Sequence, residues 1–271
     1  MRIRTALGRF LTRFGRFIQS LAVMIMKPDD LVEFSRLAYS SPAAVEGWGK
    51  KGQVEAQLDP TEQALLEKIP VKKGRLLLLG LGGGREAIPL AKMGFEVTGV
   101  DFIPDLVRQA KKNALEHGVA IEGLVQDMTK LTIEPNSYDL ACLFTAMYSC
   151  VPTRARRIEM LKRVLAGLKA GGYFLCQFQY YSPLPSSPKA EFLGKIFAYL
   201  TFGNIHYEKG DMIWRDAEFI HTFWRRDLLA SEFEQGGFQI IALNIPEDGL
   251  WGSAILRKPE TRPAGPPEIK A

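Results

Sequence analysis

Cysteine is scarce in this chain, and the cysteines that are present do not suggest a metal centre or a disulfide framework. There are three of them, Cys142, Cys150 and Cys176, an odd number without metal-ligand spacing. Cys142 and Cys176 fall inside apolar segments that we expect to be buried strands. We therefore predict small buried thiols in a reducing compartment, the cytoplasm, and no bound metal.

Long apolar runs are also missing. No segment approaches the roughly 18–20 consecutive apolar residues that a membrane-spanning helix needs. The apolar block at residues 21–26 is short, and no small-residue cleavage site follows it, so we do not expect a signal peptide. With 46% hydrophobic residues among 271, the chain can bury one sizeable core and still form a cap beside it.

Acidic residues are absent from residues 1–28, which hold six basic ones. The rest of the chain carries 29 basic and 30 acidic residues, so the net charge of +5 belongs to the N-terminal segment alone. The basic body of a nucleic-acid-binding protein is therefore not indicated, and we expect no nucleic-acid partner.

The N-terminal segment, residues 1–26, has apolar side chains every three or four positions and arginines mostly between them, which predicts a basic amphipathic helix. Three roles fit such a helix. It can lie on an anionic membrane surface, here the inner face of a membrane. It can cover the main domain or a partner subunit, and it can be an organellar transit peptide.

The most informative segment is the glycine-rich turn at residues 80–84, which lies between two apolar runs. The leucines before it, at residues 76–79, are typical of a strand buried on both faces. After a short helix that begins at residue 86, residues 95–100 form a second predicted strand, which ends at Asp101. This order of strand, turn, helix, strand and acid predicts a nucleoside site.

The choice of nucleoside depends on the register of the glycines. Glycines let the backbone approach a ligand closely, and a carboxylate at a strand end accepts both hydroxyl groups of a ribose. A register that starts at Gly82, with Asp101 about 20 residues further on, satisfies a dinucleotide fingerprint. The alternative register consists of Gly80, Gly82 and Gly84. The glycines alone do not decide between the two.

Five predicted strands alternate with helices between residues 60 and 178, which indicates a doubly wound parallel sheet. The later strands are expected at residues 121–125, 139–144 and 173–178. A helix over residues 226–235 and two further apolar segments follow them.

From about residue 60 to 257 the chain resembles the class I S-adenosylmethionine (SAM) dependent methyltransferases. Four features appear in the order of that family: the glycine turn, an acid after strand two, an acid after strand three, and the segment LKAGGYF before strand five. The resemblance implies an α/β fold, a doubly wound, mostly parallel seven-stranded sheet with helices on both faces. It divides the chain into an N-terminal helical extension (1–59), a methyltransferase domain (60–257) with a cap insertion (180–224), and a flexible tail (258–271).

The resemblance also implies which residues bind SAM. These residues lie in four places: the glycine turn beneath the methionine part of SAM, the acid that binds the ribose, the acid beside the adenine, and the end of strand four. At the end of strand four the methyl donor and the acceptor meet. The matching residues are Gly80, Leu81, Gly82, Gly84, Asp101, Phe102, Asp127, Met128, Phe144 and Thr145. For Asp101 and Asp127 the alternative role is that of a helix or turn cap.

One position departs from the family pattern. Many members carry an acid two residues before the first glycine, and this chain has Leu78 there. Glu86 is a candidate substitute for that carboxylate, and a solvated position on the helix surface is its alternative. The departure keeps open the interpretation that the fold serves as a non-catalytic scaffold.

The sequence does not identify a catalytic residue. Methyl transfer depends mostly on positioning, and a general base is optional. The weak candidates for a base are His206, His221 and Tyr148, followed by Asp211 and Tyr207. The acceptor pocket should come from the N-terminal helices and the cap insertion, whose aromatic side chains suit a hydrophobic or aromatic small molecule.

We therefore predict a SAM-dependent methyltransferase that acts on a small-molecule or lipid-like acceptor at oxygen, nitrogen or carbon. No Asn-Pro-Pro-Tyr sequence follows strand four, which argues against methylation of amino groups on DNA bases or glutamine. Two alternatives remain: an NAD(P)-dependent oxidoreductase, and a non-catalytic scaffold or partner subunit with the same fold.

Overall fold

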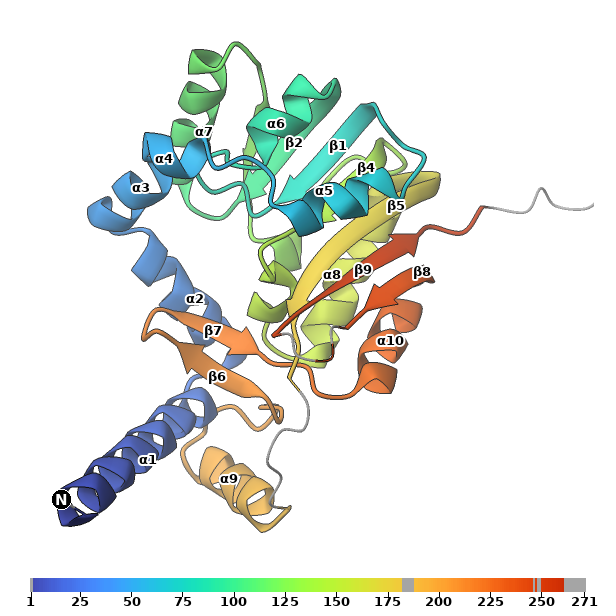
Figure 1. Ribbon diagram of the computed structural model, residues 1–271. Coiled ribbons are helices and arrows are strands. Elements are labelled where there is room, and N and C mark those ends of the chain that lie inside the picture. The colour runs from blue at the N-terminus through green and yellow to red at the C-terminus, as the bar shows by residue number, and fades with distance from the viewer. Residues whose placement is uncertain (1, 182–187, 246, 248–249, 261–271) are drawn as a thin grey trace, which may run out of the picture.

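The computed structural model describes residues 2–181, 188–245, 247 and 250–260. Its centre is a seven-stranded sheet in the order β3-β2-β1-β4-β5-β9-β8, with helices on both faces (Figure 1). The strands are β1 (Gly74–Leu79), β2 (Phe95–Asp101), β3 (Glu122–Val125), β4 (Tyr138–Leu143), β5 (Leu168–Gln179), β8 (Gln239–Asn244) and β9 (Trp251–Arg257). Neighbouring strands are parallel from β3 to β5, whereas β9 is antiparallel to both β5 and β8. The predicted mostly parallel sheet with an antiparallel end is confirmed.

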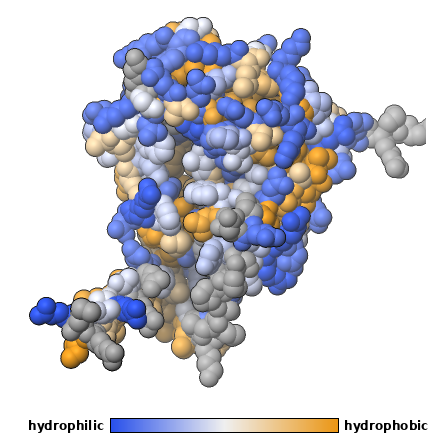
Figure 2. All heavy atoms as spheres, viewed as in Figure 1, coloured by the Kyte–Doolittle hydropathy of each residue, from blue (hydrophilic) through white to orange (hydrophobic). Residues whose placement is uncertain are grey.

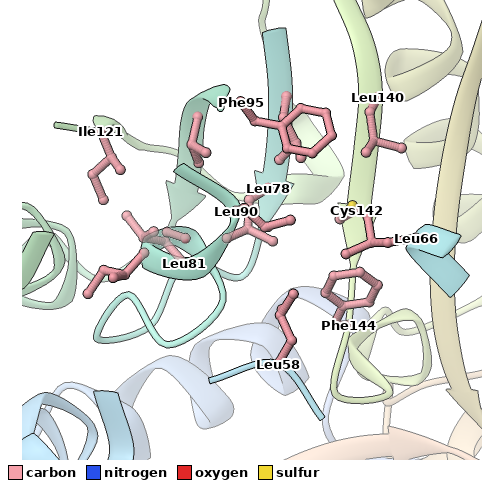
Figure 3. Close-up of a cluster of buried hydrophobic side chains, with 14 of the residues drawn as sticks. Leu58, Leu66, Leu78, Leu81, Leu90, Phe95, Ile121, Leu140, Cys142 and Phe144 are labelled. Carbon is pink, nitrogen blue, oxygen red and sulfur yellow. The ribbon is translucent and has the colours of Figure 1, made fainter. Parts of the chain in front are cut away.

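The leucines of β1 explain why this strand lies in the middle of the sheet. Leu76 and Leu78 belong to one hydrophobic core and Leu77 and Leu79 to the other, because successive side chains alternate between the two faces. All four are at most 1% exposed, and each burial contributes about 1.5–3 kcal/mol. Figure 3 shows the first core, in which Leu78 lies among other apolar side chains.

Helices cover both faces of the sheet. The first core includes side chains of α5 (Pro60–Glu67), α6 (Ala87–Lys92) and α7 (Pro104–Glu116), and the second includes side chains of α8 (Arg154–Gly167) and α10 (Arg226–Gln235). The expected helix at residues 226–235 is found with those bounds, and α8 is followed at once by the long strand β5.

A second layer stands beside the sheet at the carboxyl ends of β1 and β2 (Figure 1). It consists of α1 (Arg2–Ile25), α2 (Pro28–Tyr39), α3 (Pro42–Gly49), α4 (Lys51–Val54), α9 (Pro188–Leu200) and the antiparallel hairpin of β6 (Asp211–Trp214) and β7 (Glu218–His221). A small core of Val23, Leu31, Ile213 and Phe219 joins α1 and α2 to the hairpin. We refer to this second layer as the cap layer.

Contacts near its C-terminal end anchor helix α1 to the rest of the chain. The carbonyl oxygen of Met24 accepts a hydrogen bond of 2.6 Å from the backbone nitrogen of Asn204. Between Ile3 and Gln19, by contrast, every side chain that the structure describes is exposed, and this part of the helix extends away from the sheet (Figures 1 and 2). None of the described helices is both long and apolar enough to cross a membrane.

Two segments named in the sequence analysis fall wholly or partly outside the described residues. In these two segments the residues that are not described are 182–187 of the cap insertion and 261–271 of the predicted flexible tail. Lys258, the first residue assigned to that tail, is held in place, because its Nζ donates to Asn136 Oδ1 (2.9 Å) and to the carbonyl oxygen of Leu168 (2.7 Å). Cys142 and Cys176 are buried in β4 and β5, as expected.

Candidate active site

The glycine turn that follows β1 adopts a backbone conformation that other residues rarely take. Gly80, Gly82 and Gly84 have φ values of +77°, +51° and +95°, in the left-handed region that favours glycine. A Cβ atom on Gly82 would meet nothing within 4 Å, so the backbone is open to a ligand at that point. On Gly83 a Cβ atom would come within 2.2 Å of the carbonyl oxygen of Trp48, so α3 of the cap layer closes over the turn there.

Asp101 at the end of β2 is tied directly to the turn. Its Oδ2 accepts a hydrogen bond from the backbone nitrogen of Gly82 (2.9 Å), and its Oδ1 accepts one from that of Ile103 (3.0 Å). Burial raises the pKa of Asp101, and these backbone donors oppose that rise. Each carboxylate oxygen has a further lone pair with which it can accept a ligand hydroxyl.

Asp127 follows β3 and caps the short helix η1 (Met128–Lys130). Its Oδ1 accepts hydrogen bonds of 2.8 Å from both the backbone nitrogen and the hydroxyl of Thr129. The capping role that the sequence analysis offered as an alternative is therefore present in the structure. It uses one carboxylate oxygen and leaves the other for a ligand in the cavity that Asp127 lines.

Two adjoining cavities lie at these strand ends. The strand-end cavity, of about 210 Å³, is lined by Gly82, Glu86 and Thr145 among others, and the side cavity, of about 70 Å³, by Asp127 and Met128 among others. Their shared walls contain Tyr39, Gly80, Asp101, Phe102, Met147, Cys150 and Glu218. The structure thus brings most of the predicted cofactor residues together. Of the others, Leu81 is buried in the first core, and Gly84 packs against Ala110 of α7.

The end of β4 is the strained part of the site. Phe144 lines the strand-end cavity, and Thr145 and Ala146 after it have φ values of +53° and +55°. The backbone nitrogen of Thr145 donates to Gln177 Oε1 (2.7 Å), which holds the turn in this conformation. Non-glycine residues with positive φ concentrate at functional sites, where the surrounding structure compensates for the strain.

The departure at Leu78 has a structural explanation. Leu78 is 1% exposed in the first core, and Glu86 instead supplies a carboxylate to the strand-end cavity. Burial raises the pKa of Glu86, whereas the ion pair with Arg85 and a hydrogen bond from Thr145 Oγ1 (3.2 Å) lower it. Arg85 also binds Glu62 of α5 (2.7 Å).

Sequence reasoning missed Arg85 and Glu62. The signal available was the capping box of Asp59 and Glu62 at the start of α5, which the structure contains. A capping box predicts a surface helix start. It gives no hint that Glu62 is fully buried and reaches across to the glycine turn.

The cap layer forms the remaining wall of the strand-end cavity. Tyr39 and Trp48 come from the N-terminal helices, and Trp214, Glu218 and Ile220 come from the hairpin. This agrees with the expected origin of an acceptor pocket. Among the described aromatic residues of the cap insertion, Trp214 is the one that lines this cavity.

The three weak candidates for a base lie elsewhere. Tyr148 is fully buried, and its hydroxyl donates to Glu232 Oε2 (2.9 Å). His221 lines a separate basic cavity of about 270 Å³, where its Nδ1 is 2.6 Å from Asp211 Oδ1. His206 lines neither the strand-end cavity nor the side cavity.

His221, Asp211 and Glu208 come within 4.8 Å of one another, a spacing at which such groups can hold a metal ion. Each already has a protein partner, however. Asp211 Oδ2 accepts from the backbone nitrogen of Glu208 (2.7 Å), and Glu208 Oε2 pairs with Arg157 (2.8 Å). The cluster is thus part of an internal ion network.

Comparisons with known proteins agree with this geometry. Residues 76–172 match the family model of a methyltransferase domain. A ubiquinone biosynthesis O-methyltransferase of Xylella fastidiosa is 32% identical over 108 residues, which cover 39% of this chain and 42% of that protein. A 23S rRNA (uracil(1939)-C(5))-methyltransferase of Shewanella sp. is 43% identical over 70 residues, 25% of this chain and 16% of that protein. A solved SAM-dependent methyltransferase from Methanosarcina mazei has a TM-score of 0.59 at 22% identity, over 76% of this chain and 100% of that one.

The strand order, the glycine turn and the acids after β2 and β3 define a Rossmann-like fold of the methyltransferase type. The antiparallel end of the sheet, which a dinucleotide oxidoreductase does not predict, agrees with this class. Residues 76–172 match a methyltransferase domain, the fold is consistent with the class I SAM-dependent methyltransferases, and the cofactor of that class is SAM. The chain spans about two fifths of the length of the ubiquinone biosynthesis relatives that it matches.

The residues present fit SAM. Open space above Gly82 admits a ligand against the backbone, and Asp101 lies where the two cavities meet. A nucleoside with an amino-acid tail needs such an elongated site, with a carboxylate for the ribose in the middle and polar groups at both ends.

Proposed function

We propose that this protein transfers a methyl group from SAM to a hydroxyl oxygen of a small aromatic or lipid-like acceptor. The observation that carries the proposal is the strand-end cavity, which joins the nucleoside-binding ends of β1 and β2 to an aromatic wall from the cap layer. The likeness to ubiquinone biosynthesis O-methyltransferases supports oxygen as the acceptor atom and a lipid-like acceptor.

Each part of the site has one task in this proposal. Asp101 accepts the ribose hydroxyls, Asp127 accepts from the adenine amino group, and Glu86 faces the ammonium group of the methionine part. SAM, when bound, supplies a methyl group already activated by its positively charged sulfur. Trp48 and Trp214 provide apolar surface on which an aromatic acceptor packs, so that its hydroxyl is held at attack distance and water is excluded.

Titration calorimetry with SAM and S-adenosylhomocysteine, followed by a methyl-transfer assay with catechol, tests the proposal. We expect binding of both nucleosides and formation of a methyl ether. No binding at millimolar nucleoside would overturn the proposal. Binding without transfer to catechol or to any other small acceptor would favour the non-catalytic scaffold suggested by Leu78.

We further propose that α1 places the enzyme on an anionic membrane surface inside the cell. Its exposed part presents apolar side chains in the pattern of an interfacial helix, and residues 1–28 contain six basic residues and no acid. The large exposed apolar side chains of this part of α1 are Ile3, Leu7, Phe10, Leu11, Phe14, Phe17 and Ile18. A lipid-like acceptor would be available at such a surface.

Deletion of residues 1–18 tests the membrane proposal without disturbing Val23, which is part of the cap-layer core. We expect the full chain to float with vesicles that contain anionic phospholipid and the deletion variant to remain in the unbound fraction. Equal partitioning of the two forms would contradict the proposal. Loss of an oligomer on deletion, without a change in flotation, would assign α1 to a partner subunit instead.

A further inference from the structure

Glu218 occupies the wall that the strand-end cavity shares with the side cavity. It is the first residue of β7, in the hairpin of the cap layer, whereas the residues assigned to the cofactor come from the sheet side. Gly80 and Asp101 are in the same shared wall. The Glu218 carboxylate therefore lies near the middle of the site and not at its adenine or its ammonium end.

The groups around Glu218 are weak acids and one distant cation. The Tyr39 hydroxyl of α2 interacts with this carboxylate and lowers its pKa, and Cys150 Sγ of the short helix η2 (Met147–Cys150) donates to Oε2 at 3.9 Å. Arg215, in the exposed turn of the hairpin, acts on Glu218 through its charge. Burial raises the pKa of Glu218, and these three groups oppose that rise only in part.

The other acids of the two cavities are held differently. Asp101 accepts two backbone N–H donors, Asp127 caps η1, and Glu86 is paired with Arg85. Those contacts already engage at least one oxygen of each carboxylate with a donor from the protein. Glu218 has neither a backbone donor nor an ion pair among the described residues, so it is the cavity carboxylate best suited to exchange a proton.

We propose that Glu218 is the general base for the acceptor hydroxyl and that Tyr39 is the positioning residue that orients its carboxylate. The inference rests on the proposed function and deepens it. The acceptor O–H bond breaks and its proton passes to a carboxylate oxygen of Glu218. The oxygen electron pair forms the new bond to the methyl carbon, while the bond from that carbon to sulfur breaks and its electron pair stays on sulfur. The proton then leaves Glu218 to solvent.

This role makes a specific prediction about acceptor acidity. A base is most needed when the acceptor hydroxyl is weakly acidic, as in catechol, and least needed when it ionises by itself near neutral pH, as in 4-nitrocatechol. Replacing Glu218 should therefore harm the first reaction much more than the second.

The test compares Glu218→Gln with Asp216→Asn, a matched carboxylate-to-amide change at an exposed position of the same hairpin that lines neither cavity. For Glu218→Gln we expect a loss in kcat of roughly 100-fold or more with catechol, less than about 10-fold with 4-nitrocatechol, and loss of the acid limb of the pH profile. Asp216→Asn should behave like the wild type. SAM affinity by calorimetry should be unchanged in both variants, which shows that the fold is intact.

A binding readout complements the kinetics. The absorbance of 4-nitrocatechol bound with S-adenosylhomocysteine reports its ionisation, and removal of the neighbouring carboxylate should lower its apparent pKa relative to the wild type. The role of Glu218 would be overturned if Glu218→Gln and the wild type had equal rates with catechol, equal pH profiles and the same pKa of bound 4-nitrocatechol. That outcome would leave the proposed methyl transfer intact. A wild-type protein that binds no SAM would overturn the proposed function as well.

Discussion

The two sides of the cavity are built in opposite ways. On the sheet side, residues of β1, the glycine turn and β2 follow one another closely in the sequence, and backbone donors fix Asp101. On the cap side, Tyr39 and Glu218 come from segments 179 residues apart, and the phenol and the carboxylate shift each other's pKa. The sheet side is suited to a cofactor common to a whole family, whereas the cap side can change its acceptor without disturbing the cofactor.

The largest expected effect concerns the link between the two sides. Arg157 of α8 is fully buried and binds Glu232 of α10 and Glu208 of the cap layer, each at 2.8 Å. Arg157→Ala removes the buried guanidinium that both carboxylates bind and leaves Glu232 only the more distant Arg154 (4.0 Å) as a cation among the described residues, so we expect a loss of about 3–5 kcal/mol in the free energy of unfolding. Urea denaturation of the variant and the wild type measures this difference in the free energy of unfolding.

Arg163→Ala is the control for that experiment. Arg163 lies on the same helix and pairs with Glu159 at the surface, with 39% of its side chain exposed, so its removal should cost less than about 1 kcal/mol. Equal losses in the two variants would mean that the buried network does not hold the cap layer to the sheet.

The second prediction concerns the cofactor side alone. Asp101→Asn replaces one accepting oxygen with an N–H donor beside the backbone nitrogen of Gly82 and weakens the acceptors for the ribose. Two hydrogen bonds to a charged group are at stake, so SAM affinity should fall by roughly 100-fold or more.

Titration calorimetry with SAM should compare Asp101→Asn with Asp105→Asn. Asp105 is an exposed residue in the first turn of α7. The second variant should bind SAM like the wild type. Wild-type affinity in Asp101→Asn would show that the glycine register, and with it the placement of the ribose, is wrong.

The contact between the two sides gives a third, smaller effect. A methyl group on Gly83 collides with the carbonyl oxygen of Trp48, so Gly83→Ala should displace α3 from the glycine turn at a cost of about 1–3 kcal/mol. Trp48 also lines the cavity, and its fluorescence should become more accessible to a quencher such as acrylamide. Gly52→Ala in α4, where a Cβ meets nothing within 4 Å, is the control that should leave the fluorescence unchanged.

The same contrast explains what could be predicted from the sequence. The apolar run at residues 76–79 and the glycines after it predicted β1 and the turn, because local pattern and backbone geometry decide both. The hairpin of β6 and β7 was missed, since two four-residue strands carry too little periodicity to be recognised. The partners of Glu62 and Glu218 depend on how distant segments pack, which no local pattern encodes. The histidines were predicted as candidate bases from the chemistry of their side chains, whereas the structure places His221 in an ion network.

The smallest effect tests whether Tyr39 acts through Glu218. The Tyr39 hydroxyl lowers the pKa of Glu218 by favouring its charged form, while burial raises it above the ordinary value. Tyr39→Phe removes that donor, so the pKa of Glu218 should rise further, and the acid limb of the pH profile should move to higher pH. A hydrogen bond to a charged group contributes about 1.5–3 kcal/mol and one to a neutral group about 1 kcal/mol, and the difference corresponds to a shift of roughly one pH unit.

The raised pKa of Glu218 also determines how the stability of the protein changes with pH. Because the folded state binds the Glu218 proton more tightly than the unfolded state, stability falls as pH rises from the unfolded pKa through the folded one. Tyr39→Phe should extend that fall to higher pH, whereas a tyrosine that only packs against the cavity wall would lower stability equally at every pH. An acid limb that stays in place, with stability lowered uniformly, would make Tyr39 a packing residue and leave Glu218 to act without it.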